Sequence, residues 1–194
     1  MEINMKIKRK IVIIFVLVVL YGIRVYTVNT DVRLPVREVF EKGEVVSYGQ
    51  DFNISSNDMC KGYTVQVLDS KIMKAKEFCE KYDVTDIGLA NYYYMVRVSV
   101  ENLNNTYIEE QGVSMGLAML MGTNYSIISS SDMFKVLNPQ MPASSFSLKV
   151  GTKKDMWLVF QMIPGNAPDY KQIKKNPPML QITQYPCQKL IKLL

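Results

Sequence analysis

The stretch Tyr92-Tyr-Tyr-Met-Val-Arg-Val-Ser-Val-Glu101 decides the fold of this 194-residue chain. Alternate residues from Tyr94 to Val100 share one face of an extended chain, whereas Arg97 and Ser99 lie on the other. Alternation of this kind, with β-branched and aromatic residues, is typical of a half-buried β-strand. The stretch therefore predicts a central strand with one face turned towards a hydrophobic core.

Shorter runs of the same kind lie on both sides of this strand, bounded by the Gly, Pro and Asn residues that favour turns. The further expected strands are residues 44–48, 63–68, 113–121, 124–128, 145–150, 155–162 and 179–184. Two segments are helical in character, Lys71–Tyr82 and Ser131–Leu137. The pattern predicts a mainly β protein, an immunoglobulin-like antiparallel β-sandwich with one or two short inserted helices.

An N-terminal transmembrane helix is expected to precede the sandwich. Four basic residues within Lys6–Lys10 are followed by the uncharged, mostly apolar run Ile11–Ile23. Continued through Arg24 to Val28, a helix would span about 27 Å, close to a bilayer core of roughly 30 Å. Secretory signal peptides share this pattern, but residues 24–30 contain no Ala, Gly or Ser to form a cleavage site. We expect an uncleaved signal-anchor, with a secreted product after cleavage as the alternative.

The expected organisation has four parts. Residues 1–28 form the basic segment and the signal-anchor, 29–43 a stem, 44–186 the sandwich, and 187–194 a C-terminal tail. The positive-inside rule leaves the N-terminus in the cytoplasm and places the domain outside the cell membrane.

The charge distribution argues against nucleic-acid binding. Residues 1–24 carry five basic residues and one acid, whereas the rest carries 18 basic and 17 acidic residues. A nucleic-acid binder needs its positive charge on the folded domain, because phosphate neutralisation supplies the affinity.

The composition also argues against an enzyme. With no His and 3 Cys, the chain can form no Ser-His-Asp triad and no imidazole or four-cysteine metal site. Gly112-Val-Ser114-Met-Gly116 matches the G-x-S-x-G motif but has no base to accept the serine proton. We expect no catalytic, cofactor or metal site.

Two further polar patterns are weak. Residues 51–58 alternate oxygen-bearing side chains as a calcium loop does, but Ser56 and Gly62 replace the required Gly and Glu. A polar turn is expected there. Clustered acids that a glycan hydrolase could use are expected to be solvated turn charges; they are Asp83, Asp86, Glu109 and Glu110.

Cys60 and Cys79 are candidates for one disulfide if the domain faces an oxidising compartment. The bridge would close a loop of about 20 residues and stabilise by about 3 kcal/mol. The open alternative is a buried thiol, since Cys79 lies on the apolar face of its expected helix. Cys187 is left over.

Aromatic residues allow a second hypothesis, stacking against a glycan. The candidates are Tyr92, Tyr93, Tyr94, Tyr107, Tyr125 and Trp157. Aromatic residues in strands more often form core or cross-strand contacts, which is the expected role here.

Five segments resemble small exported proteins of Gram-positive, Clostridia-type bacteria. They are Gly62–Leu68, the helix ending at Glu80-Lys-Tyr82, Tyr94–Asn102, Gly122–Tyr125 and Phe146–Thr152. Together they are similar to the uncharacterised DUF5028 and DUF4352 families over roughly residues 40–185. The resemblance implies an immunoglobulin-like extracellular domain behind an N-terminal membrane segment, and it implies no site or activity.

The functional expectation is a non-enzymatic binding module at the cell surface, with an unknown protein or glycan partner besides the membrane. Loops at residues 102–107 and 163–176 are the first candidates for the contact surface. The alternative is a structural or assembly subunit that acts through its membrane segment and stem.

Overall fold

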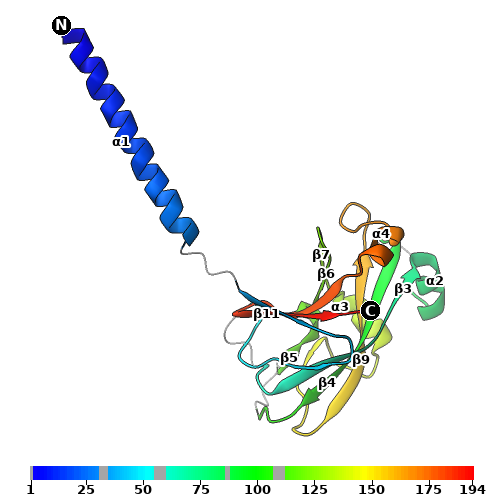
Figure 1. Ribbon diagram of the computed structural model, residues 1–194. Helices are drawn as coiled ribbons and strands as arrows, with labels where there is room; N and C mark the ends of the chain where they lie inside the picture. The colour runs from blue at the N-terminus through cyan, green and yellow to red at the C-terminus, as the bar shows by residue number, and fades with distance from the viewer. Residues whose placement is uncertain (1, 31–34, 55–59, 86–87, 107–111) are drawn as a thin grey trace. The chain divides into compact units, whose positions relative to one another are not determined.

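A computed structural model describes residues 2–30, 35–54, 60–85, 88–106 and 112–194 (Figure 1). The chain divides into two compact units, Met1–Leu34 and Pro35–Leu194. The first unit is helical and the second holds all the described strands. The predicted mainly β class, with antiparallel sheets, short helices and a preceding apolar helix, is confirmed.

The first unit consists of helix α1, Glu2–Thr30. Its segment Ile7–Thr30 is long and apolar enough to cross a membrane, and a signal sequence would have the same character. These 24 residues span about 36 Å at 1.5 Å per residue, so the helix exceeds the bilayer core. Within the helix, the side chains described from residue 7 onward are exposed, as a lipid-facing segment requires.

The second unit contains two sheets and a short ribbon. The larger sheet has the order β1 (Val36–Phe40), β11 (Cys187–Lys192), β10 (Met179–Thr183), β6 (Met119–Met121) and β7 (Ser126–Ile128). The smaller sheet has the order β2 (Val45–Ser47), β3 (Tyr63–Lys74), β4 (Tyr92–Asn102) and β9 (Lys153–Met162). A ribbon joins β5 (Val113–Ser114) to β8 (Ser145–Phe146). Among these pairs, β1 with β11 is parallel and the others are antiparallel.

The main hydrophobic core lies between the two sheets. Val96 and Val98 of β4 and Leu180 of β10 belong to one cluster, and each is fully buried. The opposite face of β4 carries Arg97, as its alternation predicted. The immunoglobulin-like assignment within the β class stays a prediction.

Two helices pack on the outer face of the smaller sheet. Helix α2 (Ala75–Tyr82) and helix α3 (Ser131–Leu137) contribute to a second cluster with Met95 and Val159. Phe78 of α2 stacks on the ring of Tyr93, with 4.0 Å between the ring centroids. The sandwich therefore has a third layer over this part of the sheet.

The predicted stem and tail are wrong. Both are strands of the larger sheet, because β1 pairs with β11 in the register Val36↔Cys187 to Phe40↔Ile191. The signals were weak because both strands are short, and a parallel pair between the two ends of the domain has no local turn to announce it. The sandwich therefore extends from Pro35 to the C-terminus.

Helix boundaries also differ from the prediction. Strand β3 continues to Lys74, so α2 begins at Ala75 instead of residue 71. A bulge between Val67 and Asp69 shifts the register of β3 and hides the alternation beyond residue 68. The expected loop 163–176 contains a short helix, α4 (Tyr170–Lys175). The expected helix at Ser131–Leu137 is confirmed as α3.

Candidate functional site

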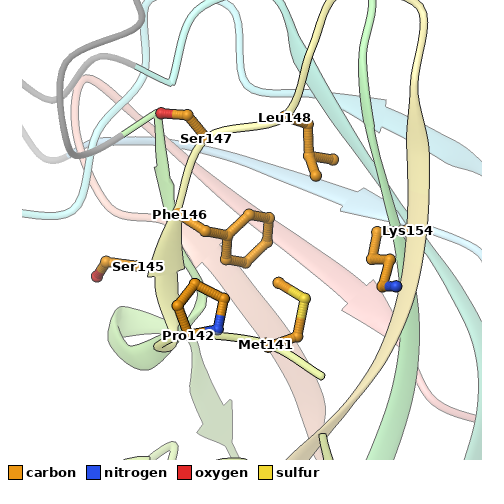
Figure 2. Close-up of a pocket in the computed structure, with 7 residues that line it drawn as sticks. All are labelled: Met141, Pro142, Ser145, Phe146, Ser147, Leu148 and Lys154. Atoms are coloured by element: carbon orange, nitrogen blue, oxygen red, sulfur yellow. The ribbon is translucent and has the colours of Figure 1, made fainter. Parts of the chain in front are cut away.

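A pocket of about 510 Å³ opens at the end of the sandwich where β9 begins (Figure 2). Its lining combines apolar and polar side chains. These are Met141, Pro142, Ser145, Phe146, Ser147, Leu148 and Lys154. All but Lys154 come from one segment, residues 141–148, and Figure 2 shows Ser145 and Pro142 of this segment across the pocket from Lys154.

Buried polar groups hold this segment in place. The hydroxyl of Tyr63, which is fully buried, accepts the N–H of Leu148 at 2.9 Å. The side-chain amide of Asn102 donates to the carbonyl of Leu148 at 2.6 Å. Ser147 Oγ accepts the N–H of Gly112 at 2.9 Å. These bonds anchor the pocket wall to β3 and β4, so the pocket is preformed.

The chemistry of the pocket is apolar with one cationic group. Lys154 pairs with Val100, whose side chain is in the inter-sheet core, so the lysine projects from the inner face of β9. No ion pair between described residues includes Lys154. The site can therefore receive an apolar group together with a carboxylate or another acceptor.

The edge of β9 beside the pocket is only partly covered. The side-chain amide of Asn138 bonds both the N–H and the carbonyl of Trp157, each at 2.9 Å. The N–H of Ser130 donates to the carbonyl of Val159 at 2.8 Å. The backbone N–H and carbonyl groups of Lys153 and Asp155 also point away from β4, and no hydrogen bond between described residues involves them. The backbone of these two residues, next to the pocket, is therefore free to pair with another strand.

The serine motif is not a nucleophile elbow. Ser114 ends the short strand β5, and a 3-10 helix, η1 (Met115–Leu117), follows it. The Ser114 hydroxyl lies 2.7 Å from that of Ser145, so it bonds a second serine and no base. The motif therefore contributes one strand of the two-stranded ribbon that β5 forms with β8.

The calcium-like loop is tied by protein contacts. The Asp51 carboxylate pairs with Lys189 Nζ at 2.5 Å, and Asn53 donates to the carbonyl of Ile182 at 2.8 Å. Residues 55–59 lie outside the described residues. In the described part of the chain, no three His, Cys, Asp or Glu side chains gather where a metal ion could bind.

The two candidate cysteines lie in different hydrophobic clusters. Cys60 belongs to the inter-sheet core and Cys79 to the cluster under α2, so the smaller sheet lies between them. No disulfide joins them in the structure, and the Cys60 thiol donates to the carbonyl of Asp51 at 3.4 Å. Both side chains are buried.

The aromatic residues of the stacking hypothesis are engaged in internal contacts. Tyr92 stacks on Tyr170 at 5.4 Å, and Tyr94 is buried between the sheets. Lys71 Nζ lies 4.4 Å from the ring centroid of Trp157. The described rings are spread over separate layers and form no shared platform; Tyr107 lies outside the described residues.

Of the clustered acids, Asp83 is the left-handed C-cap residue of α2. This is a structural role, in which its backbone N–H bonds the carbonyl of Cys79. The other three, Asp86, Glu109 and Glu110, lie outside the described residues.

The two loops expected to form the contact surface lie at opposite ends of β4. One loop starts at Asn102, the last residue of β4, beside the pocket, and its residue 107 is outside the described range. The stretch 163–176 follows Met162, which pairs with Tyr92 at the first residue of β4. Eleven strand residues span about 35 Å, so the two loops cannot form one compact surface.

The sequence did not predict the pocket, because the segment that forms its wall has the alternating pattern of an ordinary strand. Residues 145–150 alternate, but only Ser145–Phe146 pair with another strand. One signal was available. Three lysines, Lys149, Lys153 and Lys154, lie close together in sequence, and no acidic residue stands among them.

Burial changes the acidity of several groups near the domain's core. It raises the pKa of Tyr48 well above its ordinary value, and the nearby Cys60 adds to the effect. Burial raises the pKa of the half-buried Cys187, and the nearby Glu38 raises it further. Burial raises the pKa of Tyr125 to about 12. All these groups are neutral at physiological pH, which favours packing roles over acid–base chemistry.

Comparison with known families supports the domain limits found in the structure. The family model described as "Domain of unknown function (DUF5028)" matches residues 37–189, from β1 into β11. It therefore takes in both strands that the sequence had suggested were stem and tail. No curated protein and no solved structure matches the chain. The predicted resemblance to DUF5028 is confirmed, and the chain belongs to the DUF5028 family.

Proposed function

We propose that this protein is a non-enzymatic binding module held at the outer surface of the cell membrane by α1. The basic residues before Ile11 stay in the cytoplasm under the positive-inside rule, and the sandwich lies outside. The missing small residues at 24–30 favour retention of the helix as a signal-anchor.

One observation carries the binding role: the preformed pocket lies beside the uncovered edge of β9. The outward backbone groups of Lys153 and Asp155 can pair with an added strand. A side chain of that strand can enter the apolar pocket, and a carboxylate can meet Lys154. The geometry suits a short extended protein segment with an apolar residue and an acidic residue.

A protein segment suits this site better than a glycan. Glycan binding commonly relies on an exposed aromatic face, and the rings near β4 are engaged in contacts of their own. The pocket contributes the Phe146 ring, which is 4% exposed.

Site-specific photo-crosslinking in the cells that make the full chain tests the binding role. A photoreactive residue at Leu148, in the pocket wall, should give a discrete adduct. The same residue at Leu89, 52% exposed and close to the far end of β4, is the matched control. Lys154→Glu should remove the adduct, because the partner's carboxylate would then face a like charge.

Three results contradict this proposal. They are no adduct at Leu148, the same adduct at Leu148 and Leu89, and an adduct that Lys154→Glu leaves unchanged. The mass of the adduct identifies the partner as protein or glycan.

A structural or assembly subunit is the second candidate, favoured by the length of α1. In that case activity depends on the sequence of the helix, and replacing Ile11–Ile23 by an unrelated apolar span abolishes assembly. The binding module tolerates the same exchange, because the helix acts only as an anchor. Cleavage of α1 gives the remaining alternative, a secreted binding factor.

A further inference from the structure

Apolar side chains gather where the chain enters the sandwich. Val36 is 65% exposed, Ile54 is 74% exposed and Tyr185 is 44% exposed. These three residues, with the half-buried Phe52, are called the N-terminal rim below. Exposed apolar side chains that cluster in this way mark an interaction surface more often than scattered ones do.

Backbone pairing brings together the segments that carry the rim residues. The N–H of Val36 donates to the carbonyl of Pro186 at 3.3 Å. Phe52 and Tyr185 exchange hydrogen bonds at 2.6 and 2.9 Å, and their ring centroids lie 6.2 Å apart. Ile54 follows two residues after Phe52. Figure 1 shows β1 beginning beside β11.

A buried ion pair fixes the rim from below. Lys189 and Asp51 are 11% and 12% exposed, and Lys189 Nζ also donates to the carbonyl of Ser47 at 2.7 Å. The other Asp51 oxygen accepts the N–H of Cys187 at 3.2 Å. The turn is therefore held in a shape that leaves Val36, Ile54 and Tyr185 in solvent.

The covalent chain limits how far the rim can be from an anchored α1. Only residues 31–35 separate the end of α1 from Val36. A chain of that length reaches at most roughly 20 Å. Exposed apolar side chains have no evident role in water. Their position this close to the end of a membrane span therefore points to contact with the bilayer.

We propose that the N-terminal rim rests in the interface of the outer lipid leaflet. Tyr is enriched at membrane interfaces, where its ring is apolar and its hydroxyl stays wet, and Val and Ile gain from leaving water. Arg37, exposed next to Val36, can meet a lipid phosphate. The lipid bilayer is the occupant, and the inference rests on the proposal that α1 stays in place as an anchor.

Lipid quenching of tryptophan fluorescence tests the contact in the full chain, reconstituted into nanodiscs with plain or bromine-labelled acyl chains. The wild type, whose only tryptophan is Trp157, sets the baseline. Ile54→Trp and Tyr185→Trp probe the rim. Leu89→Trp is the exposed control, 52% exposed and close to the far end of β4, and Leu17→Trp reports on the span itself.

We expect about a twofold loss of the added fluorescence for both rim variants in bromine-labelled lipid, because interfacial side chains lie some 5–10 Å into the headgroup boundary. Leu89→Trp should match the wild-type baseline. Two rim variants guard against a substitution that disturbs the turn.

The Leu17→Trp result separates the two possible failures. If Leu17→Trp is quenched and both rim variants behave like Leu89→Trp, the rim proposal is overturned while the anchor stands. If Leu17→Trp is not quenched, the anchor fails and the rim proposal falls with it. A rim fluorescence that responds to protein concentration but not to bromine shows a second copy on the rim, which also overturns the proposal.

Discussion

The β1 and β9 sides of the sandwich end in different ways. On the β1 side the edge strand has five residues and carries Arg37 and Glu38, two charges that discourage pairing with another chain. On the β9 side the edge strand has ten residues, and Asn138 covers its middle with a side chain that imitates a strand. The first edge is protected along its length, whereas the second is closed at Trp157 and open at Lys153 and Asp155.

This difference shows which surface the chain leaves available. Each side is fastened by one buried polar residue, Lys189 on the β1 side and Asn138 on the β9 side. Lys189 fixes a turn that presents apolar side chains, and Asn138 fixes the limit of a free backbone edge. Removing either residue should damage its own side and leave the other intact.

The largest effect is expected from Lys189→Met. This change leaves the Asp51 carboxylate and the carbonyl of Ser47 buried without their partner. Breaking a buried ion pair from one side costs about 3–5 kcal/mol of unfolding free energy. Urea unfolding of the full chain in detergent measures the loss. The matched control is Lys192→Met, whose pair with Glu41 is exposed, and its cost should stay under about 1 kcal/mol. Equal losses for the two variants would show that burial of the pair does not matter.

A smaller loss is expected from Asn138→Ala. The N–H and carbonyl of Trp157 would both lose their partner, and Asn138 is 1% exposed. Leaving buried backbone groups unpaired should cost about 2–3 kcal/mol and lengthen the free edge of β9. Urea unfolding gives the cost, and light scattering reports edge-to-edge association. Asn176→Ala, at the exposed C-cap of α4, should change stability by less than about 0.5 kcal/mol. An Asn138→Ala chain as stable as Asn176→Ala would contradict the edge-capping role.

The smallest effect is expected at alkaline pH. The pKa of Tyr125 is raised to about 12, against about 10 in an unfolded chain. As pH rises from 10 to 12 the unfolded state loses this proton first, so stability that is complete below pH 10 declines across that window. In the described part of the chain the Tyr125 hydroxyl has no hydrogen-bond partner, so Tyr125→Phe should be neutral at pH 7. At pH 11.5 the variant should retain about 1 kcal/mol more of its unfolding free energy than the wild type does, once solvent screening of a half-buried ring is allowed for. Parallel loss in the two chains would contradict the raised pKa.

The predictions from sequence were most accurate where the pattern within a single strand or helix is enough to define it. The alternation around Val96 placed the core face and the polar face of β4 correctly, and the apolar face of α2 that carries Cys79 was also correct. Both patterns depend only on neighbours within the same element. The pairing of Val36 with Cys187 was not predictable, because it joins two short segments about 150 residues apart through a parallel ladder.

The site was harder to predict than the fold. Asn138 is the C-cap residue of α3, but its contact with Trp157 depends on how α3 lies against β9. The pocket has the same origin. Phe146 and Lys154 face one space only because Tyr63 and Asn102 hold the segment between them, and no local pattern encodes that.

The most direct test of an anchored external domain is the intact mass of the native protein after membranes and medium are separated. We predict a full-length chain in the membrane fraction, with a sandwich that protease added to intact cells can reach. A chain in the medium lacking about 28 residues would show signal cleavage and contradict the anchor. A full-length chain whose sandwich is protected in intact cells would contradict the external location.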